Sequence, residues 1–244
     1  MIYAVVALFG FLAGLLVNYL ADVLPRYRRF VRPRCPNCGE PYSPAGYLAL
    51  QPCATCGRPR GRRAYLTYAI LTAATIFLWI DPSSWLGFWL AYLLLIFLAV
   101  VFVIDVEHRL ILHPVSIVGA VLGLAIGSFL HGWSVSLLGG AVGFGSMLAL
   151  YYLGEVFARY MAKRRGLPSD EVALGFGDVN LAGIVGLLLG YPLVIFGLLF
   201  AILVGGAFSL VLVIVMLIRR RYEAFTAIPY APFLILSVIY ALYR

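Results

Sequence analysis

Two aspartates stand at the ends of apolar segments, where burying an ionised carboxylate is costly. Asp105 closes the run FLAVVFVIDVEH, and Asp178 opens the run GFGDVNLAGIVGLLLG. Two carboxylates held close together cannot both ionise, so one keeps a proton while the other stays charged. The charged member can activate water and the protonated member can donate to a carbonyl oxygen, which is the chemistry of aspartic proteases.

Four cysteines provide a second candidate site. They form two Cys-x-x-Cys pairs, Cys35 with Cys38 and Cys53 with Cys56, with fourteen residues between the pairs. Each pair makes a tight turn that presents two thiolates, and two such turns complete a tetrahedral zinc site. A glycine follows each pair, where a zinc knuckle needs a small residue. Four protein ligands leave no open position, so the spacing predicts a structural zinc; two disulfides or a redox-active pair are the alternatives.

The elements that carry these residues are apolar segments of membrane-spanning length. The chain has 244 residues, of which 64% are hydrophobic and 11% charged, and its mean hydropathy is +1.00. A soluble domain is nearer one quarter charged. The composition predicts an all-α membrane protein with about eight transmembrane helices. We expect these helices at residues 2–23, 64–80, 84–105, 114–130, 134–157, 177–190, 192–218 and 228–243.

Positive charge predicts the orientation of these segments. The alternate loops 24–63, 106–113, 158–176 and 219–227 hold all but one of the 18 lysines and arginines, and the opposite loops hold none. Under the positive-inside rule the charged loops are cytoplasmic and both termini lie outside. The net charge of +8 then reflects topology and attraction to anionic lipid, and we expect no nucleic-acid partner. A cytoplasmic loop keeps its thiols reduced, which disfavours disulfides.

The same topology places both aspartates near the cytoplasmic boundary. The segment that ends at Asp105 runs inward, and the segment that begins at Asp178 runs outward. Two other interpretations remain open: each carboxylate caps a helix or meets an arginine, or the pair lines a cation or proton pathway. Gly175 and Gly177 would let a substrate backbone approach Asp178 closely. Asp22, at a helix end, is interpreted as a terminal charge.

Several of these motifs together resemble the bacterial type IV prepilin peptidases, which are GxGD intramembrane aspartyl proteases. The first helix (GFLAGLLVNYLADVLP), the two cysteine pairs, IDVEHRLI, GFGDVNLAG and IPYAPFL occur in the same order as the family's landmarks. The resemblance places the two catalytic roles on Asp105 and Asp178. It also assigns a supporting position to Pro229, in IPYAPFL. Apart from the resemblance, His108 is expected to be an interfacial residue near Asp105 that tunes the acidity of that carboxylate.

The resemblance implies a reaction and a substrate. Members of this family cut the basic leader from type IV prepilin-like precursors or pseudopilins at the cytoplasmic face of the bacterial inner membrane. Many also methylate the new amino terminus with S-adenosylmethionine, which stays an open possibility for this chain. The sequence departs from the family at Leu112 and His113, after HRLI, and at Asn180, where lysine is usual. These departures bear on substrate positioning and on the acidity of the aspartate pair.

The resulting expectation has three parts. Residues 1–23 form a first transmembrane helix, residues 24–63 a cytoplasmic zinc-binding loop domain, and residues 64–244 a seven-helix peptidase core. The chain is expected to be an intramembrane aspartyl endopeptidase that contacts lipid and a prepilin substrate. A transporter that uses the same acids as cation or proton ligands is the competing hypothesis.

Overall fold

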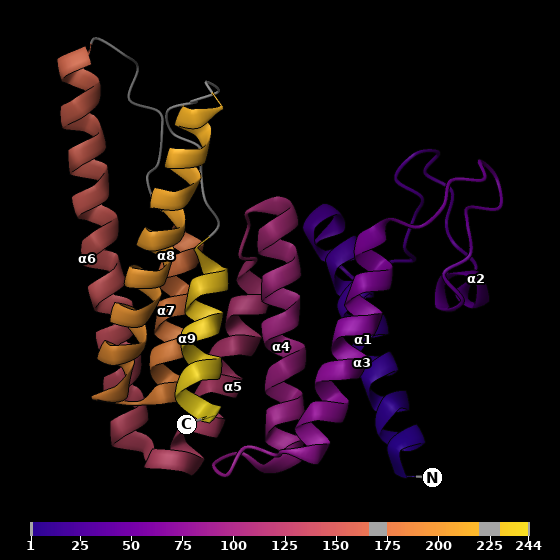
Figure 1. The fold of residues 1–244 in the computed structure, drawn as a ribbon, viewed down its shortest axis with the longest axis horizontal. Helices are drawn as coiled ribbons and strands as arrows, with labels where there is room; N and C mark the ends of the chain where they lie inside the picture. Colours follow the sequence, from indigo (N-terminus) through magenta and orange to yellow (C-terminus); the bar gives the residue numbers. More distant parts are fainter. Residues whose placement is uncertain (1, 166–174, 220–229, 244) are drawn as a thin grey trace. The chain divides into compact units, whose positions relative to one another are not determined.

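The predicted all-helical architecture is confirmed. A computed structural model of the chain describes residues 2–165, 175–219 and 230–243. Across those ranges the structure contains helices and one isolated bridge, between Arg34 and Pro41, but no strand. The helices, labelled in Figure 1, are α1 (Ile2–Tyr27), α2 (Pro44–Leu48), α3 (Arg62–Ile80), α4 (Gly87–His108), α5 (His113–His131), α6 (Trp133–Arg165), α7 (Phe176–Leu189), α8 (Leu193–Ile218) and α9 (Ala231–Tyr243).

Every apolar segment predicted from the sequence corresponds to a helix. In the described part of the chain, six helices are long and apolar enough to cross a membrane: α1, α3, α4, α5, α6 and α8. The other two segments form the shorter apolar helices α7, of 14 residues, and α9, of 13 residues. At about 1.5 Å per residue, α7 extends only about 21 Å, against about 30 Å for the hydrocarbon core of a bilayer. The chain is therefore a multi-pass membrane protein with two further, short apolar helices.

The chain divides into two compact units between Ile104 and Asp105. In the first unit α1 packs along α3. Close approach of the two helices requires glycine at position 10, where a Cβ atom would lie 2.5 Å from the Cα atom of Thr72. Tyr92, on α4, donates a hydrogen bond to the carbonyl of Phe9 over 2.8 Å. The division expected at residues 23 and 63 remains a prediction.

The second unit is organised around α7, which packs against α5, α6, α8 and α9. In Figure 1, α7 lies among these helices and most of its length is covered by them. Its contact with α6 is backbone to backbone: a Cβ atom at Gly186 would lie 2.1 Å from the carbonyl oxygen of Gly139. Ser136 donates a hydrogen bond of 2.6 Å to the carbonyl of Leu187. The protein that surrounds α7 explains how so short an apolar helix is accommodated.

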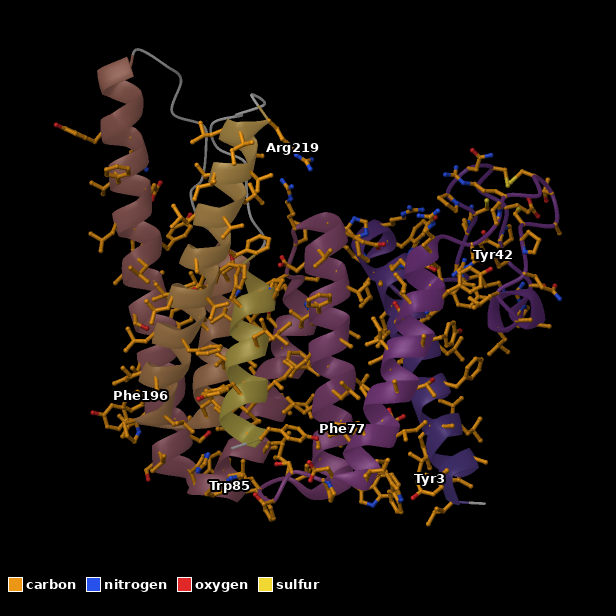
Figure 2. All side chains as sticks on the ribbon, in the orientation of Figure 1. Tyr3, Tyr42, Phe77, Trp85, Phe196 and Arg219 are labelled. Carbon is orange, nitrogen blue, oxygen red and sulfur yellow. The ribbon has the colours of Figure 1, made fainter. Side chains whose placement is uncertain are left out.

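Apolar side chains cover the outer sides of the long helices. On α8, Phe196 is 65% exposed, Leu203 71% and Ile218 76%. Figure 2 shows Phe196 pointing outward and carbon-rich side chains along the same helix. Exposed apolar surface on this scale matches contact with lipid acyl chains.

Candidate active site and metal-binding loop

Asp105 lies in the last turn of α4 and is almost completely buried, with 4% of its surface exposed. The backbone N–H of Ala231, the first residue of α9, hydrogen-bonds to its carboxylate. Arg109 interacts with the same carboxylate electrostatically. The Oδ2 atom is buried and has no hydrogen-bond partner among the described residues. A buried carboxylate oxygen left unpaired is costly, which makes Asp105 a candidate for a functional role.

Asp178 lies in the first turn of α7, where Gly175 is the N-cap residue. The N–H of Asp178 donates to the carbonyl of Gly175 over 3.0 Å, and the N–H of Gly175 hydrogen-bonds to the Asp178 carboxylate. Asp178 therefore stands three residues into the helix and reaches back to the cap, as the acidic member of a capping box does. This contact fixes the carboxylate at the positive end of the helix dipole.

The ends of α4, α7 and α9 bring three polar side chains into one region of the second unit. Asp105 and Asp178 lie close enough to interact electrostatically. Tyr230, directly before α9, interacts electrostatically with Asp178. Two carboxylates that interact electrostatically in one region form a candidate acid–base pair.

The other predicted site residues have different surroundings. A Cβ atom at Gly177 would lie 2.8 Å from the Cβ atom of Ile111, so the segment between α4 and α5 covers the start of α7. Asn180 is partly exposed on α7. His108 ends α4, and its Nε2 atom lies 3.9 Å from a carboxylate oxygen of Glu107. Pro229 lies outside the described residues.

The structure adds neighbours that the sequence analysis did not single out. Arg109 has a positive φ of 53° at the end of α4, and its N–H donates to the Asp105 carbonyl over 2.7 Å. Tyr230 and Ala231 belong to the motif IPYAPFL, which was noted only for its resemblance. That motif was the one sequence feature that could have identified these two residues. Its prolines indicate a conformationally restricted segment after the last loop, but they do not indicate which of its groups interact with the aspartates.

The four cysteines form one cluster. Their sulfur atoms all lie within 4.8 Å of one another. The Sγ atoms of Cys35 and Cys56 are 3.7 Å apart, and those of Cys38 and Cys53 are 3.5 Å apart. A disulfide would require about 2.05 Å, so all four thiols are free. Zinc–sulfur bonds of about 2.3 Å in a tetrahedron separate the sulfurs by roughly 3.8 Å, which is close to these distances.

The two cysteine pairs have the same backbone conformation. The N–H of Cys35 donates to the carbonyl five residues later, and so does the N–H of Cys53, at 2.8 and 2.9 Å. The glycines that follow, Gly39 and Gly57, have φ values of +76° and +67°, which a side chain would strain. The small residue expected after each pair is thus needed for its left-handed conformation.

The turns also favour a thiolate at the first cysteine of each pair. The backbone N–H groups of Cys38 and Asn37 point at the Cys35 sulfur and lower the pKa of that thiol to about 6. The corresponding N–H groups of Cys56 and Thr55 lower the pKa of Cys53. Thiolates are the form that binds a metal ion, so this cluster fits a soft cation.

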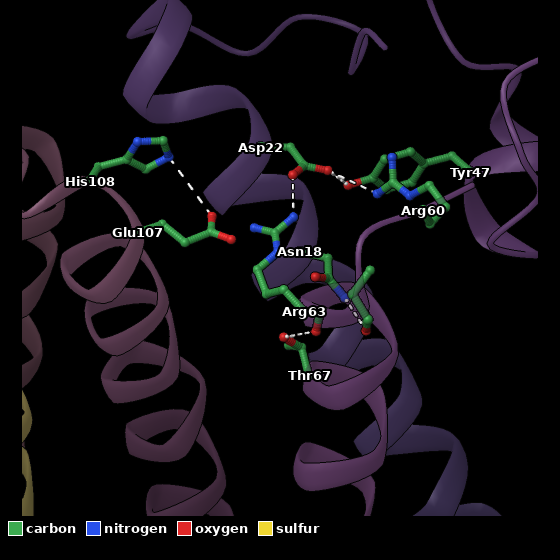
Figure 3. Close-up of polar contacts among 9 residues, drawn as sticks. Asn18, Asp22, Tyr47, Arg60, Arg63, Thr67, Glu107 and His108 are labelled. Carbon is green, nitrogen blue, oxygen red and sulfur yellow. Dashed lines mark hydrogen bonds and ion pairs between the residues drawn. The ribbon is translucent and has the colours of Figure 1, made fainter. Parts of the chain in front are cut away.

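An ion-pair network, the Asp22 network, joins the loop to the helix ends and consists of Asp22, Tyr47, Arg60 and Arg63 (Figure 3). Asp22, near the end of α1, forms salt bridges with Arg63 and, at 2.9 Å, with Arg60. The Tyr47 hydroxyl donates to the same carboxylate over 2.7 Å. The Arg60 guanidinium lies 4.3 Å from the centre of the Tyr47 ring.

This network replaces the interpretation of Asp22 as a terminal charge. Burial raises the pKa of Tyr47, and the Asp22 charge raises it further, so the hydroxyl remains a donor. Although burial opposes it, the Asp22 charge raises the pKa of Arg60 and keeps the guanidinium charged. Beside the network, Asn18 donates a hydrogen bond of 3.2 Å to the carbonyl of Ala64.

The chain is similar to known proteins over most of its length. It is 30% identical over 226 residues to a prepilin leader peptidase/N-methyltransferase from Myxococcus xanthus, covering 85% of this chain and 63% of that protein. It is 27% identical over 216 residues to the protein of the same name from Pseudomonas aeruginosa, covering 83% of this chain and 68% of that protein. The chain thus spans less than two thirds of the Myxococcus protein. No solved structure matches it.

A comparison with protein families gives the same assignment. Residues 92–210 match the type IV leader peptidase family, and this range includes both Asp105 and Asp178. Together with the similarity to two prepilin leader peptidases, this match shows a type IV leader peptidase domain in residues 92–210 of the chain.

Proposed function

We propose that this protein is an intramembrane aspartyl endopeptidase that removes the basic leader from type IV prepilin-like precursors. The family and the two relatives support a prepilin peptidase. The observation that carries the mechanism is the pair of aspartates: the nearly buried Asp105 has an unpaired carboxylate oxygen and interacts electrostatically with Asp178. Such pairs are found where a carboxyl and a carboxylate cooperate on one substrate group.

In the proposed reaction the ionised carboxylate takes a proton from water while the water oxygen bonds to the scissile carbonyl carbon. The protonated carboxyl gives its proton to the carbonyl oxygen, and a tetrahedral diol forms. The carbon–nitrogen bond then breaks as one hydroxyl of the diol gives its proton to the carboxylate that protonated the carbonyl, and the leaving nitrogen takes from the other carboxyl the proton that came from water. The products are a carboxylic acid and a free amino terminus, and the pair regains its single proton.

The proposed site of cleavage is the cytoplasmic face of the inner membrane. The positive-inside rule keeps a basic leader in the cytoplasm, so the hydrophobic helix of the precursor would enter the bilayer beside α7. The same rule places the arginine-rich loop between α1 and α3 on that face. Lipid and a prepilin or pseudopilin are thus the proposed partners.

The four cysteines are proposed to hold a structural zinc ion. The separations between their sulfurs and the low thiol pKa of Cys35 fit that ion. A four-thiolate site is closed, so the metal would stabilise the loop and have no place in the cleavage reaction.

The proposal can be tested by co-expressing the protein with a tagged prepilin whose leader is basic. Asp105→Asn and Asp178→Asn are expected to abolish leader removal, because each removes one half of the proton-sharing pair. Asp81→Asn is the matched control: Asp81 is exposed at the end of α3, so removal of its charge should leave cleavage intact. Continued cleavage by either active-site variant, with the protein inserted, would contradict the assignment.

Methylation of the new amino terminus is a second proposed activity. Its support is the name of the two relatives, which includes N-methyltransferase. Purified protein, a cleaved pilin peptide and S-adenosylmethionine should then yield a product heavier by one methylene, as measured by mass spectrometry. An unchanged peptide mass, in a preparation that still cleaves the leader, would remove this half of the proposal.

The competing transport hypothesis uses the same two carboxylates as cation or proton ligands. Proteoliposomes that contain the purified chain and a pH-sensitive dye distinguish the two. The peptidase proposal expects leader cleavage without proton or sodium flux. Flux that depends on Asp105 and Asp178, without cleavage, would favour transport.

A further inference from the structure

We propose that the Tyr230 hydroxyl donates a hydrogen bond to the scissile carbonyl oxygen of the substrate, beside the protonated carboxyl of the Asp105 and Asp178 pair. This inference rests on the proposed peptidase function and adds a third residue to its site.

Adjacent residues of one segment interact with different aspartates. The N–H of Ala231 hydrogen-bonds to the carboxylate of Asp105, and Tyr230 interacts electrostatically with Asp178. The start of α9 therefore touches the Asp105 carboxylate and lies in the same region as Asp178. A side chain in this position is well placed to reach a peptide bond held between them.

The Tyr230 hydroxyl is buried and has no hydrogen-bond partner among the described residues. A buried hydroxyl left unpaired costs about 1–3 kcal/mol, and phenylalanine would avoid that cost while filling the same space. The Oδ2 atom of Asp105 is another buried polar atom of the same unit that has no hydrogen-bond partner among the described residues. The unpaired Tyr230 hydroxyl can donate to the carbonyl oxygen of a peptide bond, and the unpaired Asp105 oxygen can accept from a water molecule.

The direction of the ring is fixed by packing. A Cβ atom at Gly205, on α8, would lie 3.3 Å from the Tyr230 ring. The ring also lies near that of Phe233, with 6.0 Å between ring centres and an angle of 58°. The Tyr230 carbonyl also accepts from the N–H of Phe233 over 3.1 Å, which ties the residue to the first turn of α9. The hydroxyl is thus preorganised, and a preorganised donor stabilises charge in the transition state without having to reorient.

A carbonyl oxygen has two lone pairs and can accept two hydrogen bonds. The protonated carboxyl would supply one donor and Tyr230 the other. Because negative charge grows on that oxygen as water attacks, the second hydrogen bond would strengthen in the transition state. No proton needs to leave Tyr230 in this role.

The test is Tyr230→Phe, which removes the hydroxyl and keeps the ring. With purified protein and a leader-containing peptide, we expect kcat to fall about 10- to 100-fold, and KM to change by less than about 2-fold. The midpoint of thermal unfolding should stay the same or rise, because an unpaired buried group is removed. Tyr240→Phe is the matched control, since Tyr240 lies on α9 with 46% of its surface exposed, and both kinetic constants should be unchanged.

Two results would overturn the inference: an unchanged kcat, or a loss that arises only through KM. A fall in kcat accompanied by a lower unfolding midpoint would also count against it, because that result indicates a packing role. Asp178→Asn, measured alongside, separates the two proposals. If Asp178→Asn is inactive and Tyr230→Phe is normal, only the role of Tyr230 fails; if Asp178→Asn remains active, the aspartyl mechanism fails and the role of Tyr230 with it.

Discussion

The Asp22 network offers a quantitative test of how the cysteine loop is held. In Asp22→Asn the charge is lost, although one amide oxygen still accepts a hydrogen bond. The carboxylate accepts from Tyr47, Arg60 and Arg63, and the Arg60 side chain is only 6% exposed. The substitution would therefore leave a guanidinium largely desolvated and without its counter-charge.

The magnitude follows from these contacts. Hydrogen bonds to a charged group contribute about 1.5–3 kcal/mol, against about 1 kcal/mol for a neutral one. Removing one partner of a fully buried pair costs about 3–5 kcal/mol. Asp22 and Arg63 are each 23% exposed, so water offsets part of the loss. We expect about 2 kcal/mol, which is about 30-fold in the equilibrium for local opening of the loop.

The assay is limited trypsin digestion in detergent, because trypsin cuts after the arginines that surround the cysteine pairs. When the loop opens and closes faster than trypsin cuts, the cleavage rate follows the population of the open loop. Asp22→Asn should then be cut in the loop about 30-fold faster than the wild type. Glu40→Gln, which changes the charge of an exposed side chain in the same loop, is the control and should be cut at the wild-type rate. A rate within about 3-fold of the wild type for Asp22→Asn would refute the reasoning.

Three further predictions concern glycine, backbone strain and pH. Gly177→Ala should lower leader cleavage about 10-fold or more, because its Cβ atom would lie 2.8 Å from that of Ile111; Ile111→Ala in the same chain should restore part of the activity. Gly57→Ala, at a φ of +67°, should destabilise the metal-bound loop by about 1 kcal/mol, measured as faster metal loss to a chelator, whereas Gly206→Ala should not. Metal retention should fall as the pH drops, because protons compete with the metal for four thiolates, of which the Cys35 thiol has a pKa lowered to about 6 and the Cys38 thiol a pKa raised to about 12. Retention that is unchanged down to pH of about 5 would contradict this.

The helices were predictable because membrane-spanning helices are continuous apolar runs. Their orientation was predicted from the lysines and arginines, which are concentrated in alternate loops. The capping role of Gly175 and Asp178 is local, within four residues, and so lies within the range of a sequence pattern. The cluster of four cysteines was also predictable, because each Cys-x-x-Cys turn has its own local geometry.

Contacts between distant segments were not predictable in the same way. Asp22 meets Arg60 and Arg63, which lie 38 and 41 positions later, and no periodicity connects residues at that separation. Tyr230 was noted only as the aromatic residue of a motif, because nothing local indicates that its hydroxyl would lie near Asp178. The short length of α7 was visible in the sequence, whereas the four helices that cover it became apparent only in the fold.

The central claim is that Asp105 and Asp178 act as one catalytic unit, and a double-mutant cycle tests it most directly. The rate constant for leader cleavage would be measured with purified wild type, Asp105→Asn, Asp178→Asn and the double variant. The account predicts that each single variant loses activity by a factor on the order of 10³ or more, and that the double variant is no worse than either single variant. Losses that multiply in the double variant, or a single variant that keeps substantial activity, would contradict the shared role of the two carboxylates.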